Sequence, residues 1–206
     1  MKHNTDSGNV LFLILIAVVL FAALSYAVTQ SSRGGGSVDR ETNKLIAQKF
    51  INFGNSVRVG VQRMQLIEGI DVQDINFGEN ATGSNAIFAA EGGGVAWIDP
   101  PPEAYDGGGP YVWSFSKPSN NWGAWGVGTD TSGSGAEAFI WIMNLDEDVC
   151  KSINELMGHP YEIPVDSNGS GPLSSGYTMS AYEGEWAWCY QEGSQAPEFI
   201  FILDDN

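Results

Sequence analysis

Residues 8–29 read GNVLFLILIAVVLFAALSYAVT, an uncharged and almost wholly apolar stretch. Its section Val10–Val28 has no proline and is long enough, as a helix, to cross the hydrocarbon core of a bilayer. A buried helix of a soluble protein is rarely apolar on every side. The stretch therefore predicts a transmembrane helix over 9–30.

The fate of this helix is open from its composition alone. Ser25 and Ala27 are small and two residues apart, which suits cleavage by signal peptidase after Ala27 and release of a secreted domain. The apolar run is longer than the usual core of a signal peptide, and Asp6 offsets the positive charge of Lys2. An uncleaved membrane anchor is the other simple interpretation.

The next segments predict a break and then a second helix. Three consecutive glycines favour neither helix nor strand, so 31–37 is expected to be a glycine-rich break. Over 38–68 the apolar residues recur every three or four positions, which predicts an amphipathic helix packed on a sheet. Gly54 and Gly60 weaken this helix and allow a bend. Its apolar face is expected to comprise Ile46, Phe50, Phe53, Val57, Val61, Met64 and Ile67.

The remaining residues, 69–206, predict a β-rich head domain. Short β-prone runs at 85–101 and 109–117 lie between glycine and proline clusters. A stronger strand is expected within 137–145, with Ile140 and Ile142 on one face and Phe139, Trp141 and Met143 on the other. A short helix, 146–158, precedes two antiparallel strands within 184–191 and 198–205. The fold class is therefore α+β, a long N-terminal helix on an antiparallel sheet.

The N-terminal pattern resembles that of type IV pilins and pseudopilins. A short polar leader, residues 1–8 (MKHNTDSG), contains the basic Lys2, ends at Gly8 and directly precedes the apolar helix. The resemblance implies that a prepilin peptidase cuts between Gly8 and Asn9, so that the apolar helix stays in the mature subunit. It also implies a bacterial inner-membrane location with the head in the periplasm, or an extracellular filament, with other pilin or pseudopilin subunits as partners.

Two positions depart from that family. Asn9 stands where the family usually has a hydrophobic residue, and Leu13 stands where the fifth mature residue is usually Glu. In the family this Glu is thought to pair with the amino terminus of a neighbouring subunit, and some minor pilins and tip pseudopilins lack it. The resemblance therefore implies a minor or initiating subunit.

The two cysteines, Cys150 and Cys189, both follow the apolar helix. Cysteines that lie outside the cytoplasm are expected to be oxidised. Pilins commonly close their C-terminal section with one disulfide, and the resemblance implies that this pair forms it. Two buried free thiols are the alternative.

Two loops suggest a calcium site. The sequences DTSGSG (130–135) and DSNGSG (166–171) place oxygen-bearing side chains at alternate positions before a glycine, as in the first half of an EF-hand loop. Both lack the bidentate Glu of that loop, and two polar turns are the alternative. No cofactor is expected if the loops are polar turns; if they bind calcium, the candidate ligands are Asp130, Ser132, Ser134, Asp166, Asn168 and Ser170.

Trp122 and Trp125 lie in a glycine-rich stretch that offers little to bury them. Exposed tryptophan pairs are typical of surfaces that stack on sugars, whereas core packing is the alternative. These two residues carry the rival interpretation of the chain as an anchored or secreted extracytoplasmic binding domain, with carbohydrate as its ligand.

The charge and the histidine content of the chain exclude several classes of function. The net charge is −16, so nucleic acid is not an expected partner. The cations are concentrated in front: five lie between Val38 and Ile67, but only Lys117 and Lys151 lie from Asp71 onward. His159 is the one histidine of the head, so no catalytic triad is expected and the chain is predicted not to be an enzyme. The preferred interpretation is a minor pilin or pseudopilin of a type IV pilus-like filament or a type II secretion-like machine.

Overall fold

The structure is a computed structural model that describes residues 7–31, 35–107, 112–117, 137–166 and 185–204. The chain divides into two compact units, Met1–Glu41 and Thr42–Asn206. Helix α2 begins in the first unit and continues through the second.

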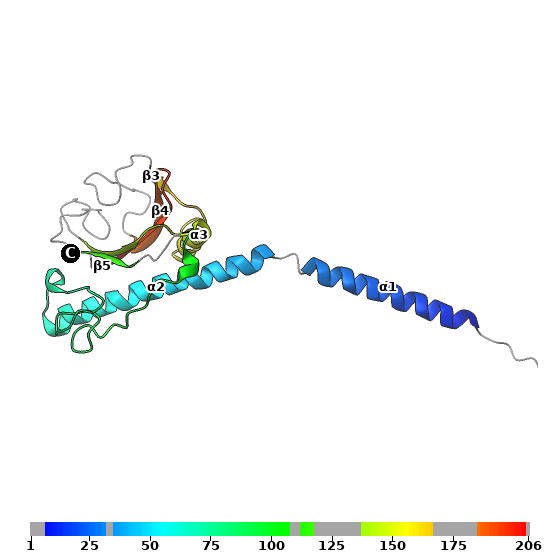
Figure 1. The fold of residues 1–206 in the computed structure, drawn as a ribbon, viewed down its shortest axis with the longest axis horizontal. Coiled ribbons are helices and arrows are strands. Elements are labelled where there is room, and N and C mark those ends of the chain that lie inside the picture. Colours follow the sequence, from blue (N-terminus) through cyan, green and yellow to red (C-terminus); the bar gives the residue numbers. More distant parts are fainter. Residues whose placement is uncertain (1–6, 32–34, 108–111, 118–136, 167–184, 205–206) are drawn as a thin grey trace, which may run out of the picture. The chain divides into compact units, whose positions relative to one another are not determined.

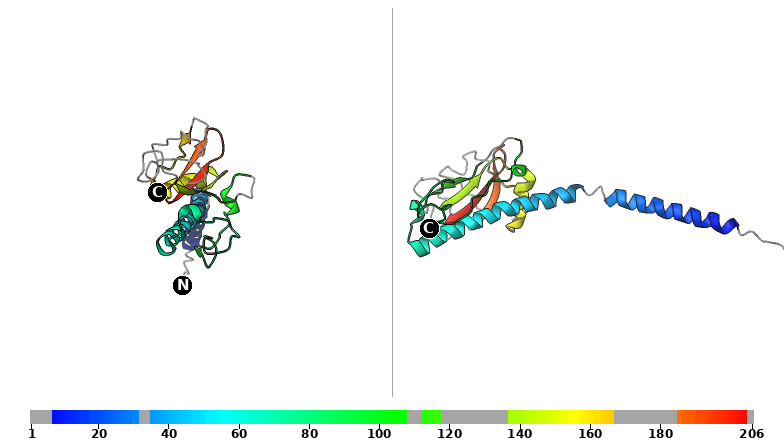
Figure 2. Two further views of the ribbon diagram at one scale, coloured as in Figure 1. Left: turned by 90° about the vertical axis from the view of Figure 1, so that its left-hand side faces the viewer. Right: turned by 60° about the horizontal axis from the view of Figure 1, so that its bottom comes forward.

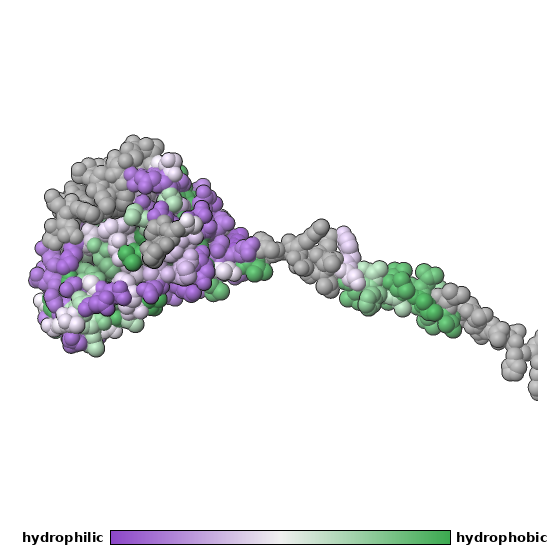
Figure 3. Space-filling view, in the orientation of Figure 1, coloured by the Kyte–Doolittle hydropathy of each residue, from purple (hydrophilic) through white to green (hydrophobic). Residues whose placement is uncertain are grey.

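The first unit contains helix α1, Ser7–Ser31, whose 25 residues extend for about 38 Å at 1.5 Å per residue. Its described side chains are large, apolar and exposed over most of its length (Figure 3). Gly8 and Asn9 lie in its first turns, so the leader expected at 1–8 and the helix expected at 9–30 are not separated by a helix boundary. Within the described residues, no helix meets the combined length and hydropathy of a membrane span.

The predicted glycine-rich break is shorter than expected. Helix α2 spans Gly35–Glu68, so the helical region begins before residue 38 and only 32–34 separate it from α1. The first N–H groups of a helix make no intrahelical hydrogen bond. Glycine in that first turn therefore costs less helix stability than glycine in the helix interior. The glycine run does not prevent helix formation there.

The second unit is built on one five-stranded sheet against which α2 packs (Figures 1 and 2). Strands β1, β2, β5 and β4 are joined by antiparallel pairs. The short β3 at the end pairs in parallel with β4 and adds a fifth strand to the predicted antiparallel sheet. In sheet order the strands are β1 (Ser114–Ser116), β2 (Ala138–Ile142), β5 (Glu198–Asp204), β4 (Ala187–Glu192) and β3 (Val165–Asp166).

The predicted apolar face of α2 forms the core against this sheet, with one correction. All of its expected members are buried except Ile67, which is exposed. The chain turns away at Gly69, whose φ is 68°, and the Ile70 N–H donates to the Met64 carbonyl at 3.1 Å. Ile70 therefore packs on the core after the turn, whereas Ile67 lies in the last turn of α2 and is exposed.

Glycine brings α2 close to the sheet. A Cβ atom at Gly54 would lie 2.5 Å from Cδ2 of Phe201, and one at Gly60 would lie 2.4 Å from Cγ2 of Val95. Real Cβ atoms do not approach other atoms so closely. The two glycines expected only to weaken the helix thus allow its close contact with β5 and with the segment after α2.

The β-prone run 85–101 forms no strand, so that expectation is wrong. Several of its backbone N–H groups form hydrogen bonds within the segment. The Ala89 N–H donates to the Ala86 carbonyl, and the Gly92 and Gly94 N–H groups donate to the Ala89 carbonyl, at 2.8–3.2 Å. Groups bonded in successive turns cannot join a ladder. The segment contributes aromatic side chains instead, and the Phe88 ring packs beside Phe53 of α2 and Trp97.

The alternation predicted for β2 is confirmed. Ile140 and Ile142 belong to the core shared with α2, whereas Phe139 belongs to a second buried cluster on the other side of the sheet. That cluster also contains Trp188, Tyr190, Ile200 and Ile202. The arrangement is the α+β, pilin-like one of a long helix on an antiparallel sheet.

Candidate functional site

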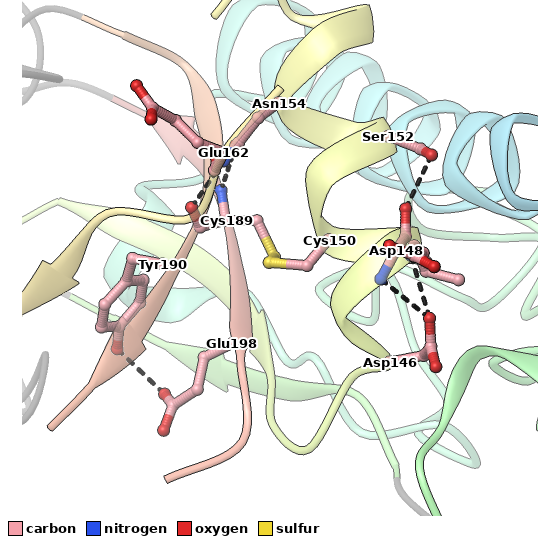
Figure 4. The surroundings of a disulfide bond; sticks show 10 residues. Asp146, Asp148, Cys150, Ser152, Asn154, Glu162, Cys189, Tyr190 and Glu198 are labelled. Atoms are coloured by element: carbon pink, nitrogen blue, oxygen red, sulfur yellow. Dashed lines mark hydrogen bonds between the residues drawn. A yellow bond between two sulfur atoms is a disulfide. The ribbon is translucent and has the colours of Figure 1, made fainter. Parts of the chain in front are cut away.

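Helix α3, Glu147–Leu156, presents the first cysteine to the sheet. The Asp146 side chain caps its start by accepting hydrogen bonds from the N–H groups of Asp148 and Val149, at 2.9 and 3.2 Å. Just beyond its end Gly158 has φ 89°, which ends the helix as predicted. With both ends fixed, Cys150 points toward β4 (Figure 4).

The Cys150–Cys189 disulfide is present, as the resemblance implied (Figure 4). The two Cα atoms are 5.4 Å apart, and both residues are fully buried in the core. Because the bond closes a loop over a separation of 39 residues, it stabilises the fold by roughly 3–4 kcal/mol in the chain-entropy model. The alternative of two free thiols is wrong.

Asn154 fixes α3 to the same strand by a second route. Its side-chain Oδ1 accepts from the Cys189 N–H at 2.8 Å, and its Nδ2 donates to the Cys189 carbonyl at 2.9 Å. Nδ2 also donates to the Glu162 carbonyl at 2.8 Å (Figure 4). The amide thus occupies the place of a peptide group beside β4. Sequence reasoning missed this role, because nothing distinguishes one helical asparagine from another before the fold is known.

A buried acid lies across the β4–β5 hairpin. Glu198 is only 3% exposed, and its carboxyl group accepts a hydrogen bond from the hydroxyl of Tyr190, its cross-strand neighbour, at 2.9 Å. Burial raises the pKa of Glu198, and the nearby negative charge of Glu192 raises it further, while the Tyr190 hydroxyl lowers it. The protonated acid is therefore favoured in the folded protein relative to an exposed glutamate.

Three cations of α2 bind groups within the second unit. Lys44 Nζ is 3.4 Å from Glu155 Oε2 on α3, and the guanidinium of Arg58 lies 3.3 Å from the centre of the Trp186 ring. The Arg63 guanidinium donates to the Gly92 carbonyl. Lys49 is exposed and makes no hydrogen bond or ion pair with any residue that the structure describes.

An open groove runs along α2 beside these cations. One hollow of about 620 Å³ lies between α2 and the segment 93–98, and includes Val59 and Arg63. A second hollow of about 460 Å³ includes Leu45, Lys49 and Glu103. Asn52 lines both, so the hollows adjoin along the helix. The groove offers an apolar surface with cationic groups at its side.

The structure brings few of the other predicted site residues together. Asp166 forms the end of β3, where its backbone pairs with Glu192 of β4. Among the described residues, no three His, Cys, Asp or Glu side chains are grouped as a metal site. Calcium binding stays a prediction. The residues outside the described part of the chain are Asp130, Ser132, Ser134, Asn168 and Ser170, together with Trp122 and Trp125.

No family model, curated protein or solved structure matches the chain.

Proposed function

We propose that the chain is a structural subunit, a minor pilin or pseudopilin, of a type IV pilus-like filament or a type II secretion-like machine. Its mature form begins at Asn9, after a prepilin peptidase has removed the leader. Helix α1 is held in the inner membrane before assembly and among the helices of other subunits after it. The β-rich head lies in the periplasm or on the outside of the filament.

The observation that carries this proposal is the order of the two helices in the chain. The apolar side chains of α1 are exposed along the helix, with Phe12 at 63% and Phe21 at 75%. Exposed apolar surface on this scale needs a lipid or protein environment. The next helix, α2, is amphipathic and buries its apolar face on the sheet. An exposed apolar helix that is followed in the sequence by a helix packed on the head fits an assembling, anchored subunit.

The disulfide supports the extracytoplasmic part of the proposal. Disulfides persist in the periplasm and outside the cell, whereas cytoplasmic thiols are kept reduced. Cys150 and Cys189 both belong to the head and form one such bond. We also propose that the chain is not an enzyme: the groove along α2 holds two hydroxyls, Thr42 and Ser56, and one carboxylate, Glu103, but no cysteine or histidine to act as a nucleophile or base beside them.

The N-terminus of the mature protein tests the proposal. When the full chain is expressed with a prepilin peptidase, we expect intact mass and Edman sequencing to give Asn9 as the first residue. The product should stay with the membrane fraction, because α1 is retained. Replacing Gly8 by a bulky residue, Gly8→Phe, should leave the precursor uncut, whereas Ser7→Ala should be processed normally.

Each of the other possible N-termini of the mature protein would identify a rival function. A mature chain that begins at Val28 would show cleavage after Ala27 and release of the head, which favours a secreted binding domain. A chain that keeps Met1 in the presence of the peptidase would favour a stand-alone anchored domain. Either result contradicts the assembly proposal and leaves the fold unaffected.

A further inference from the structure

The exposed side of α2 carries a regular pattern that packing on the sheet does not explain. Leu45, Val59 and Leu66 are exposed to 61%, 63% and 86%. With Asn52 they stand at intervals of seven residues: 45, 52, 59 and 66. We name these four residues the heptad stripe; it extends over about 32 Å of helix.

A seven-residue interval has a specific structural meaning. On a straight helix such a row drifts by about 20° per heptad, so only a helix that coils around it left-handedly can stay in contact along its length. Single exposed apolar residues are normal on protein surfaces, but three of them in one heptad register form a row that a partner helix can follow with one position per heptad. The second seam position of a full coiled coil is polar here, at Gln48, Asn55 and Gln62. The one polar member, Asn52, is of the type that fixes register in such seams.

A second row accompanies the stripe. Lys49, Ser56 and Arg63 each follow a stripe residue by four positions, which is the flanking position that sets partner choice through charge. Between Thr42 and Ile67 the helix carries four cations and no Asp or Glu. Leu45, Asn52 and Val59 line the groove with Lys49 and Arg63 beside them. The stripe is thus mostly apolar and its flank carries two cations, while Glu103 is the one acid that lines the hollows.

We propose that the heptad stripe is a docking surface for a helix of another protein that carries an apolar heptad seam flanked by Glu or Asp. A second copy of α2 is disfavoured, because pairing two such helices would bring cations only against cations. The acidic flank of the proposed partner meets Lys49, whose ammonium group has no partner among the described residues. The inference goes beyond the proposed function, since it concerns the head surface whether or not the chain enters a filament.

The test uses the full chain, kept in solution with a non-ionic detergent, and a synthetic probe. The probe is a 28-residue helical peptide with Leu at the seam positions and Glu at both flanks; a second peptide has Lys at the flanks. By fluorescence anisotropy, corrected with empty micelles, we expect the Glu peptide to bind and the Lys peptide to bind at least tenfold more weakly. Raising the salt concentration should weaken the Glu peptide's binding.

Variants of the chain locate the site. Leu45→Ser and Val59→Ser should each weaken binding of the Glu peptide about tenfold, through loss of buried apolar area. Val165→Ser is the matched control, because Val165 is exposed to 56% and belongs to β3, the edge strand at the β4 end of the sheet. Lys49→Glu should lower affinity for the Glu peptide and raise affinity for the Lys peptide.

Three results would overturn the proposal. The first is equal binding of both peptides, and the second is a loss with Val165→Ser as large as with Leu45→Ser. The third is self-association of the chain that Leu45→Ser abolishes, which would identify a second copy as the occupant. None of them depends on where the mature chain begins, so failure here and failure of the assembly proposal are distinguishable.

Discussion

At the scale of single residues, the pair of Tyr190 and Glu198 makes a contribution to the free energy of unfolding that depends on pH. Burial holds the pKa of Glu198 above its ordinary value in the folded protein, whereas in the unfolded chain the group titrates normally. Between these two pKa values the folded state keeps a proton that the unfolded state has lost. Folding stability from this group is therefore present at low pH and falls as pH rises through the folded pKa.

Glu198→Gln should remove this dependence while keeping an oxygen that accepts from Tyr190. We expect the difference in unfolding free energy, wild type minus variant, to decrease from about pH 4 toward neutrality and then to level off. Urea unfolding of the full chain at a series of pH values measures it. Taking the difference cancels the other carboxylates. A difference that increases with pH would mean that the folded protein favours the carboxylate, contrary to its burial.

At the scale of elements, the contact between α2 and β5 depends on the absence of a side chain at Gly54. Alanine at a helix interior is worth up to about 1 kcal/mol over glycine. Here its Cβ would overlap the Phe201 ring, which is fully buried and has little room to move. Overpacking of this kind costs about 1–3 kcal/mol, so the clash exceeds the gain in helix propensity.

Gly54→Ala should consequently lower the melting temperature by several degrees, since about 1 kcal/mol shifts a domain of this size by a few degrees. Asn55→Ala is the matched control: it lies next to Gly54 on the exposed side of α2 and gains helix propensity without a clash. Thermal unfolding followed by circular dichroism compares them. If both variants gained stability, the spacing of α2 and the sheet would not depend on Gly54.

Sequence patterns predicted the helix and the strand that bury one face each, because burial of one face sets the spacing of their apolar residues. The apolar spacing of α2 and the alternation of β2 each follow from burial on one side, and both are confirmed. The cap at Asp146 also follows from local chemistry. The run 85–101 was mispredicted because β-propensity measures fit to a pleated surface, and its glycine-rich turns satisfy the backbone without one.

The candidate site was predictable only in part. The disulfide was expected because both cysteines follow the apolar helix in the sequence and the resembling family commonly has one disulfide in this part of the chain. The double contact of Asn154 with Cys189 joins residues 35 positions apart, and no local pattern encodes it. The groove along α2 likewise depends on where the later segment 93–98 folds back beside the helix.

At the scale of the whole molecule, the charge is distributed so that copies of the chain resist association. From Asp71 to Asn206 there are twenty-one acidic residues and two lysines, so two heads repel each other at low salt. The cations of α2 offset only part of this, because there are four of them between Thr42 and Ile67 and Lys44 is already paired with Glu155. Contact with a less acidic partner, or with a helix whose acids meet α2, is favoured over contact with a copy.

The chain should therefore not form filaments without other subunits. Leu13 replaces the carboxylate that, in the resembling family, draws a new subunit onto a growing filament, and like-charged heads oppose close packing. When the chain is expressed with a prepilin peptidase and an assembly motor but no other subunit, we expect processed protein in the membrane and no long filaments by negative-stain electron microscopy. Leu13→Glu restores the carboxylate and is the informative variant: short filaments from it would assign the defect to position 13, and continued absence would assign it to the heads. Abundant filaments of the unaltered chain would contradict a minor-subunit role, because they would show that neither the missing carboxylate nor the repulsion between heads limits self-assembly.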